Sequence, residues 1–233
     1  MEYEGYPHLE GAAVGSSFMY KVYGWMSFAL AVTASVAYYL FKTKTFSLYL
    51  AAHPGSMILL FILQLVLVFV LAFYLFRMSF LTALVLFVLY AASLGITISS
   101  IFLIYTEASI YLTFLATSGM FAGMSLYGYF TKTDLSSIGS FSVMALWGLI
   151  GAMFLNFWFR SSLFEYIISA VGVLIFVLLT AYDTQKIKEL SRRLMTNEQG
   201  RRKFAIFGAL TLYLDFINLF LFLLQFTGDR RRS

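Results

Sequence analysis

Long apolar runs alternate with short polar connections along almost the whole chain. The runs are continuously apolar and do not alternate with polar residues, which favours membrane-spanning helices over the strands of a barrel. A helix needs about 20 apolar residues to cross the hydrocarbon core. The pattern predicts seven spans: Phe18–Phe41, Met57–Phe76, Phe80–Ile104, Ser109–Phe130, Gly139–Phe159, Leu163–Tyr182 and Phe204–Phe226.

The connections between these spans are too short to hold a soluble domain. We therefore expect one membrane domain over residues 18–226, a flexible cytoplasmic tail over residues 1–17 and a short basic tail over residues 227–233. The first tail carries three glutamates and no lysine or arginine, which is the opposite of a cleavable signal. We interpret it as a mobile segment, with a partner-binding peptide as the alternative.

Composition supports a membrane protein. Hydrophobic residues make up 61% of the chain and charged residues 12%, whereas soluble domains carry about 25% charged residues. The chain has no cysteine, and its two histidines lie outside the apolar runs, so disulfides, thiolate metal centres and histidine-rich metal sites are excluded. We expect an all-α integral membrane protein, a seven-helix bundle without a cofactor.

Basic residues predict the orientation. Of the 16 lysines and arginines, ten lie on the side of the amino terminus, which the positive-inside rule assigns to the cytoplasm. A six-span alternative, with the last segment re-entrant, would return Arg230–Arg232 to that side. The connection after the sixth span has Ile187, Leu190 and Leu194 at helical spacing among basic residues. It predicts a helix on the surface of anionic lipid, and we expect no nucleic-acid partner.

Small residues predict where helices touch, because close backbone approach drives packing in lipid. Gly119 and Gly123 form one small face, and Gly148 and Gly151, with Ala152, form another. We interpret both as packing inside the bundle, with a dimer seam as the alternative.

Two carboxylates lie where charge is unfavourable. Asp183 ends the sixth span, and Asp215 lies well inside the seventh. An ionisable residue within a span marks a candidate functional site. Taking Glu198–Gly200 as the turn between the two helices, both aspartates lie equally far from it. They are therefore expected at the same depth, facing each other.

Two carboxylates in a low dielectric tend to share one proton, and such a pair responds to pH. When both are ionised they attract a cation, and Asp183 and Asp215 are candidate transient ligands of calcium. The alternative for Asp183 is that it only caps the end of its helix at the membrane interface. Arg77, on the same side as Asp183, is a candidate counter-charge or an ordinary interface anchor.

Three motifs resemble those of the transmembrane Bax inhibitor motif (Bax inhibitor one) family, in a bacterial-type member. They are Gly95-Ile96-Thr97-Ile98-Ser99-Ser100-Ile101, Tyr182-Asp183-Thr184-Gln185 and Tyr213-Leu214-Asp215-Phe216-Ile217-Asn218-Leu219-Phe220. The resemblance implies a seven-helix fold with the last helix central and a pH-sensitive calcium leak controlled by protonation of Asp183 and Asp215. The family's arginine maps onto Arg77, and Tyr182, Tyr213 and Asn218 become candidate supporting polar groups.

Our first hypothesis is therefore a calcium leak channel in the bacterial inner (plasma) membrane, with the lipid bilayer, calcium ions and protons as partners. The alternative is a regulator that binds a membrane protease or stress-pathway protein without conducting ions. A proton-coupled transporter also suits an acidic pair, although no paired broken helices are evident. We expect no enzyme, because Gly123-Met124-Ser125 lacks the following glycine of a nucleophile elbow and no span contains a histidine.

Overall fold

The computed structural model describes residues 7–44, 49, 52–53, 55–193 and 198–231. The helices of these ranges, in chain order, are α1 (Pro7–Thr43), α3 (Ser56–Tyr74), the 3₁₀ turn η1 (Leu75–Arg77), α4 (Phe80–Ser99), α5 (Ile101–Ile104), α6 (Glu107–Phe130), α7 (Ser136–Phe159), α8 (Ser162–Arg193) and α9 (Glu198–Thr227). Seven helical segments are long and apolar enough to cross a membrane. The predicted all-α, seven-span membrane bundle is confirmed.

Capping residues explain where several of these helices begin. The Ser79 hydroxyl accepts a hydrogen bond from the amide of Thr82, and the Thr106 hydroxyl accepts one from the amide of Ser109. Both bonds satisfy amides that have no partner inside the helix. The first helix begins at Pro7, ahead of the predicted span, and proline suits the first helical position because its backbone has no N–H to satisfy. The span within it, from Ser17, agrees with the prediction.

The outer surface carries the largest apolar side chains. Trp147 and Trp158 of α7 are more than two thirds exposed, at 71% and 76%. An exposed surface of this kind would be unstable in water, but lipid chains solvate it without penalty. The bundle is therefore built for a lipid environment, and its packing must come from close helix contacts rather than from exclusion of water.

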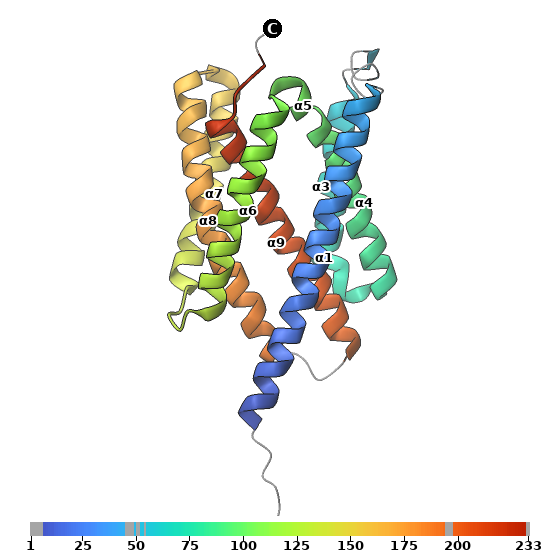
Figure 1. The fold of residues 1–233 in the computed structure, drawn as a ribbon, viewed down its shortest axis with the longest axis vertical. Helices are drawn as coiled ribbons and strands as arrows, with labels where there is room; N and C mark the ends of the chain where they lie inside the picture. Colours follow the sequence, from blue (N-terminus) through green and yellow to red (C-terminus); the bar gives the residue numbers. More distant parts are fainter. Residues whose placement is uncertain (1–6, 45–48, 50–51, 54, 194–197, 232–233) are drawn as a thin grey trace, which may run out of the picture.

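The last helix lies at the centre of the bundle. α9 runs obliquely among the other helices in Figure 1 and contacts α1, α4, α6 and α8. In its most apolar stretch 72% of residues are buried, compared with 44% in α8 and less in every other span. The predicted central position of the last helix is confirmed, and its side chains are the best shielded from lipid and water.

Close helix contacts occur at glycines other than those we predicted. A Cβ atom on Gly128 of α6 would collide with the carbonyl oxygen of Ala181, and one on Gly139 of α7 with the ring of Tyr182. Both contacts hold α8 against its neighbours. By contrast, a Cβ atom on any member of the two predicted pairs would meet nothing within 4 Å: Gly119, Gly123, Gly148 and Gly151. Their assignment to internal packing was wrong, because a small residue permits close approach but does not determine which face of the helix is covered.

The connection between α8 and α9 also differs from the prediction. α8 continues without interruption to Arg193, and Ile187 is buried against α1 and α9. The expected surface helix on lipid was therefore wrong for Ile187, while Leu194 lies outside the described residues. Glu198–Gly200 form the first turn of α9 and not the connecting turn. A glutamate at a helix start is favoured by the helix dipole.

The carboxyl end of the described chain lies at the end of the bundle opposite the start of α1 (Figure 1). α9 is a continuous helix that is long enough to cross the membrane, so the re-entrant, six-span alternative was wrong. Beyond α9 the chain runs beside the connection of α5 and α6. The amide of Thr106 donates to the carbonyl oxygen of Asp229 at 3.1 Å, and the amide of Arg231 donates to that of Ile104 at 2.8 Å.

Candidate functional site

The structure brings Asp183 and Asp215 together between α8 and α9. Their carboxyl groups are close enough to interact electrostatically. Asp215 is only 5% exposed, whereas Asp183 is partly exposed. The pair therefore joins a shielded position on the central helix to a less shielded one on α8.

The Oδ2 atom of Asp215 is fully buried and has no hydrogen-bond donor among the described residues. A buried carboxylate oxygen without a donor is unfavourable, because burial removes its water and nothing replaces that hydrogen bond. A hydrogen bond between two carboxyl groups requires a proton on one of them. Burial of this oxygen without a donor therefore disfavours the ionised form of Asp215.

Aromatic contacts fix the part of α9 that carries Asp215. The ring of Phe216 packs edge-on against Phe121 and Phe114 of α6, with ring centroids 5.4 and 5.6 Å apart. On another side, the hydroxyl groups of Tyr213 and Thr33 lie 2.7 Å apart in a buried hydrogen bond between α9 and α1. Asp215 is thus held between a packed aromatic contact and a polar one.

The part of α8 that carries Asp183 is fixed by α6 and α7. Ala181 packs on Gly128, and the Tyr182 ring packs on Gly139. On the following turn the Lys186 side chain provides the cation that interacts with Asp183, and its ammonium group lies 5.3 Å from the centre of the Tyr182 ring. Lys186 is exposed, so its attraction for Asp183 is weakened by solvent.

Arg77 is not joined to the aspartates. It ends η1, is exposed, and its guanidinium group lies 5.8 Å from the ring centre of Tyr74. None of the ion pairs found in the described ranges includes it. Lys203, near the start of α9, donates to the carbonyl oxygen of Phe76 at 3.3 Å. This bond places η1 beside the first turns of the central helix. The role of Arg77 as a counter-charge stays a prediction.

The three candidate supporting residues have different surroundings. Tyr213 makes the hydrogen bond to Thr33, and Tyr182 packs on α7. Asn218 donates to the carbonyl oxygen of Leu214 in its own helix, at 2.8 Å. Each therefore contributes to helix packing or to local structure near the pair, and a direct part in proton binding stays untested for all three.

Sequence reasoning missed the role of Gln185. Its side-chain oxygen accepts a hydrogen bond from the amide of Leu135 at 2.9 Å, and its side-chain nitrogen donates to the carbonyl oxygen of Thr133 at 2.8 Å. The same turn of α8 therefore holds the α6–α7 connection close to Asp183. An amide side chain two residues after an aspartate at a span end was the available signal, because such a group needs partners when it is buried.

Comparison with known proteins identifies relatives along nearly the whole chain. The family described as inhibitor of apoptosis-promoting Bax1 matches residues 15–232. The chain is 47% identical over 216 residues to the inner membrane protein YbhL of Escherichia coli K12, covering 92% of each chain. It is 44% identical over 220 residues to an uncharacterized protein of Borreliella burgdorferi, covering 94% of this chain and 95% of the relative.

A membrane protein of Streptococcus pyogenes is 36% identical over 216 residues, covering 91% of this chain and 93% of the relative. These relatives agree with the seven apolar helices, and the expectation of a multi-pass bacterial inner-membrane protein is confirmed. The side of the membrane on which the amino terminus lies stays a prediction. The match over nearly the whole chain shows that the protein belongs to the Bax inhibitor-1 family.

Proposed function

We propose that this protein is a pH-sensitive calcium leak channel of the bacterial inner membrane, controlled by a proton shared between Asp183 and Asp215. The observation that carries the proposal is the proximity of two carboxyl groups, one of which has a buried oxygen without a donor among the described residues. Because Asp183 lies on α8 and Asp215 on α9, a change in the charge of the pair acts where these two helices meet.

The magnitude of the repulsion supports control by protons. Two unit charges 4 Å apart interact by about 4 kcal/mol at an effective dielectric constant of about 20. Desolvation of the buried member adds to this penalty. Either a proton or a divalent cation held by carboxylate oxygens removes it. Protons and calcium ions therefore compete for the same two side chains, which makes calcium passage depend on pH.

The surroundings of Asp183 suggest how ions and protons reach the pair. Asp183 is partly exposed and lies one turn before the exposed Lys186, at the membrane side that also holds the amino terminus. Exchange with solvent then proceeds through Asp183, while Asp215 takes up the charge inside the bundle. On the predicted orientation, this side is the cytoplasm.

The test is calcium flux into reconstituted liposomes across the range from pH 5 to pH 8. Asparagine has the shape and charge of a protonated aspartate, so Asp215→Asn and Asp183→Asn should each give flux that no longer varies with pH. We expect that flux to stay near the value that the unaltered protein shows at acidic pH. Asp134→Asn is the matched control, because Asp134 is an exposed aspartate of the α6–α7 connection and its loss should leave the pH profile unchanged.

Two results would contradict the proposal. Full pH dependence in the Asp215→Asn protein would show that another group senses protons. Absence of calcium flux at every pH in correctly folded, unaltered protein would refute the channel activity. Regulation of a membrane partner would then be the better hypothesis.

A further inference from the structure

Two buried side-chain oxygens have no hydrogen-bond partner among the described residues. They are the Oγ1 atom of Thr117 on α6 and the Oδ2 atom of Asp215 on α9. Thr117 is 0% exposed and Asp215 is 5% exposed. Buried polar groups nearly always have a partner, so each exception needs an explanation. The two atoms are complementary, because a hydroxyl group can donate the hydrogen bond that a carboxylate oxygen lacks.

Aromatic packing places the two side chains at the same contact between α6 and α9. The ring of Phe216, the residue after Asp215, packs against Phe114 and Phe121, with ring centroids 5.6 and 5.4 Å apart. Thr117 lies three residues after Phe114 and four before Phe121, so these residues share one face of α6. The turn of α6 that carries Thr117 therefore faces the turn of α9 that carries Asp215.

Buried hydroxyl groups closer in sequence to the two aspartates already have partners. Thr180 donates to a carbonyl oxygen of its own helix, α8, at 2.7 Å. Thr184 donates to a hydroxyl group of α6 at 3.4 Å, and Tyr213 is bonded to α1. The hydroxyl hydrogen of Thr117, by contrast, has no acceptor among the described residues.

The charged groups around Asp215 do not supply a donor. Asp183 of α8 is the charged side chain that acts on it, and an ionised carboxylate only accepts hydrogen bonds. Lys186 acts on Asp183 from an exposed position. Of the other helices that contact α9, α4 has no charged residue, and α1 and α6 have none over Val22–Phe41 and Ala108–Thr131.

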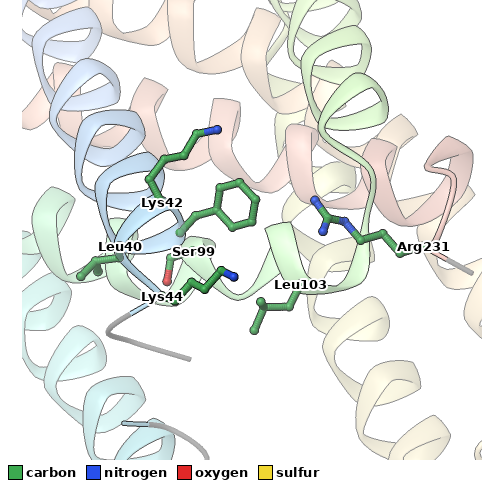
Figure 2. Close-up of a pocket in the computed structure, with 7 residues that line it drawn as sticks. Leu40, Lys42, Lys44, Ser99, Leu103 and Arg231 are labelled. Atoms are coloured by element: carbon green, nitrogen blue, oxygen red, sulfur yellow. The ribbon is translucent and has the colours of Figure 1, made fainter. Parts of the chain in front are cut away.

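Other titratable side chains have different surroundings. Figure 2 shows Lys42 and Arg231 around a pocket of about 330 Å³, and none of the described residues that line it belongs to α6, α8 or α9. Arg77 is exposed, and Tyr90 of α4 packs on the ring of Tyr213, with centroids 6.1 Å apart. A neutral hydroxyl group is therefore the donor available to an ionised carboxylate at this contact.

We propose that Thr117 is a positioning residue of the aspartate pair. When Asp215 is ionised, its carboxylate turns towards α6 and accepts a hydrogen bond from the Thr117 hydroxyl group. The terminal torsion of an aspartate side chain is broad, so this turn needs no movement of the backbone. A hydrogen bond to a charged group favours the charged form. The role of Thr117 rests on the proposed function of the pair, and it names the group that receives Asp215 after its proton leaves.

The experiment is an infrared titration of the full-length protein in liposomes between about pH 4 and pH 9, a range that covers buried carboxyl groups. It follows the carbonyl stretching band of protonated carboxyl groups, and Asp215→Asn identifies the part of the band that belongs to the pair. Thr117→Val removes the hydroxyl group and keeps the shape of the side chain. It should move the midpoint about one unit to higher pH, because loss of one hydrogen bond to a charged group raises the proton affinity about tenfold.

Thr113→Val is the matched control, because Thr113 is a buried threonine one turn away on α6. Thr113→Val and Thr117→Ser, which keeps a hydroxyl group, should both titrate within about 0.3 pH units of the unaltered protein, a twofold change in proton affinity. An unchanged midpoint in Thr117→Val, a shift to lower pH, or an equal shift in Thr113→Val would each overturn the role of Thr117. Each variant is checked for a single symmetric peak in size-exclusion chromatography. Thr117→Ala replaces the valine variant if that variant does not fold.

Calcium flux separates failure of this role from failure of the proposed function. A midpoint that moves in Thr117→Val, in a protein that conducts no calcium, would refute the channel and leave the role of Thr117 intact. A pH-dependent flux with the same midpoint in Thr117→Val and in the unaltered protein would leave the channel intact and overturn the role of Thr117.

Discussion

Substitution of Gly128 by alanine should loosen the contact that holds α8 beside Asp183. A Cβ atom at this position would overlap the carbonyl oxygen of Ala181, which is backbone and cannot swing away. Forcing extra atoms into a packed contact costs about 1–3 kcal/mol. Alanine gains little in return, because a helix in lipid is already formed before it packs. We therefore expect a net loss of about 1–3 kcal/mol in the free energy of unfolding.

The assay is unfolding in mixed micelles of increasing sodium dodecyl sulfate, followed by circular dichroism or tryptophan fluorescence. Gly123→Ala is the control, because it lies on the same helix and its Cβ atom would meet nothing within 4 Å. The control should unfold within about 0.5 kcal/mol of the unaltered protein, as expected for an uncrowded surface site. Equal stability of the two variants would refute the inferred contact between α6 and α8.

Two further predictions test the surroundings of the pair and the orientation. Gln185→Ala removes two hydrogen bonds to the α6–α7 connection. It should lower the free energy of unfolding by about 1–3 kcal/mol and speed amide hydrogen exchange at Leu135. Glu189→Ala is the control at an exposed position of the same helix and should change neither quantity. Because the chain has no cysteine, Arg160→Cys and Asp134→Cys can report topology in intact cells. An impermeant thiol reagent should label only Arg160→Cys, and the reverse labelling would invert the predicted orientation.

The spans could be predicted because lipid imposes a length and a continuous apolar character on each helix. All seven predicted spans correspond to helices, and most boundaries differ by a few residues. The helix faces could not be predicted in the same way. Gly119 and Gly148 are as small as Gly128 and Gly139, but only the last two meet another helix. In lipid, an apolar helix face has the same sequence pattern whether a neighbouring helix or an acyl chain covers it.

The pairing of the aspartates was predicted by a geometric argument that was partly wrong. It assumed a turn at Glu198–Gly200 and helices of equal inclination, whereas α8 ends at Arg193 and α9 begins at Glu198. Asp215 therefore lies further along α9 than Asp183 lies from the end of α8. The two still meet because α9 crosses the bundle obliquely and needs more residues to reach a given depth (Figure 1). The two carboxyl groups are therefore close together although the assumed turn was wrong.

The contacts next to the two aspartates explain why a change of charge should move helices and not only side chains. Asp183 follows Ala181 and Tyr182, which fill the space left by Gly128 and Gly139. Asp215 lies two residues after Tyr213, which is fully buried and bonded to α1, and directly before the packed ring of Phe216. Neither backbone can yield locally, because close-packed interiors transmit strain instead of absorbing it. Repulsion between two ionised carboxylates must then be relieved by a bound proton or cation, or by displacement of α8 relative to α9. Under the proposed function, this restriction would let the pair act as a switch, which an aspartate on a loosely packed helix would not do.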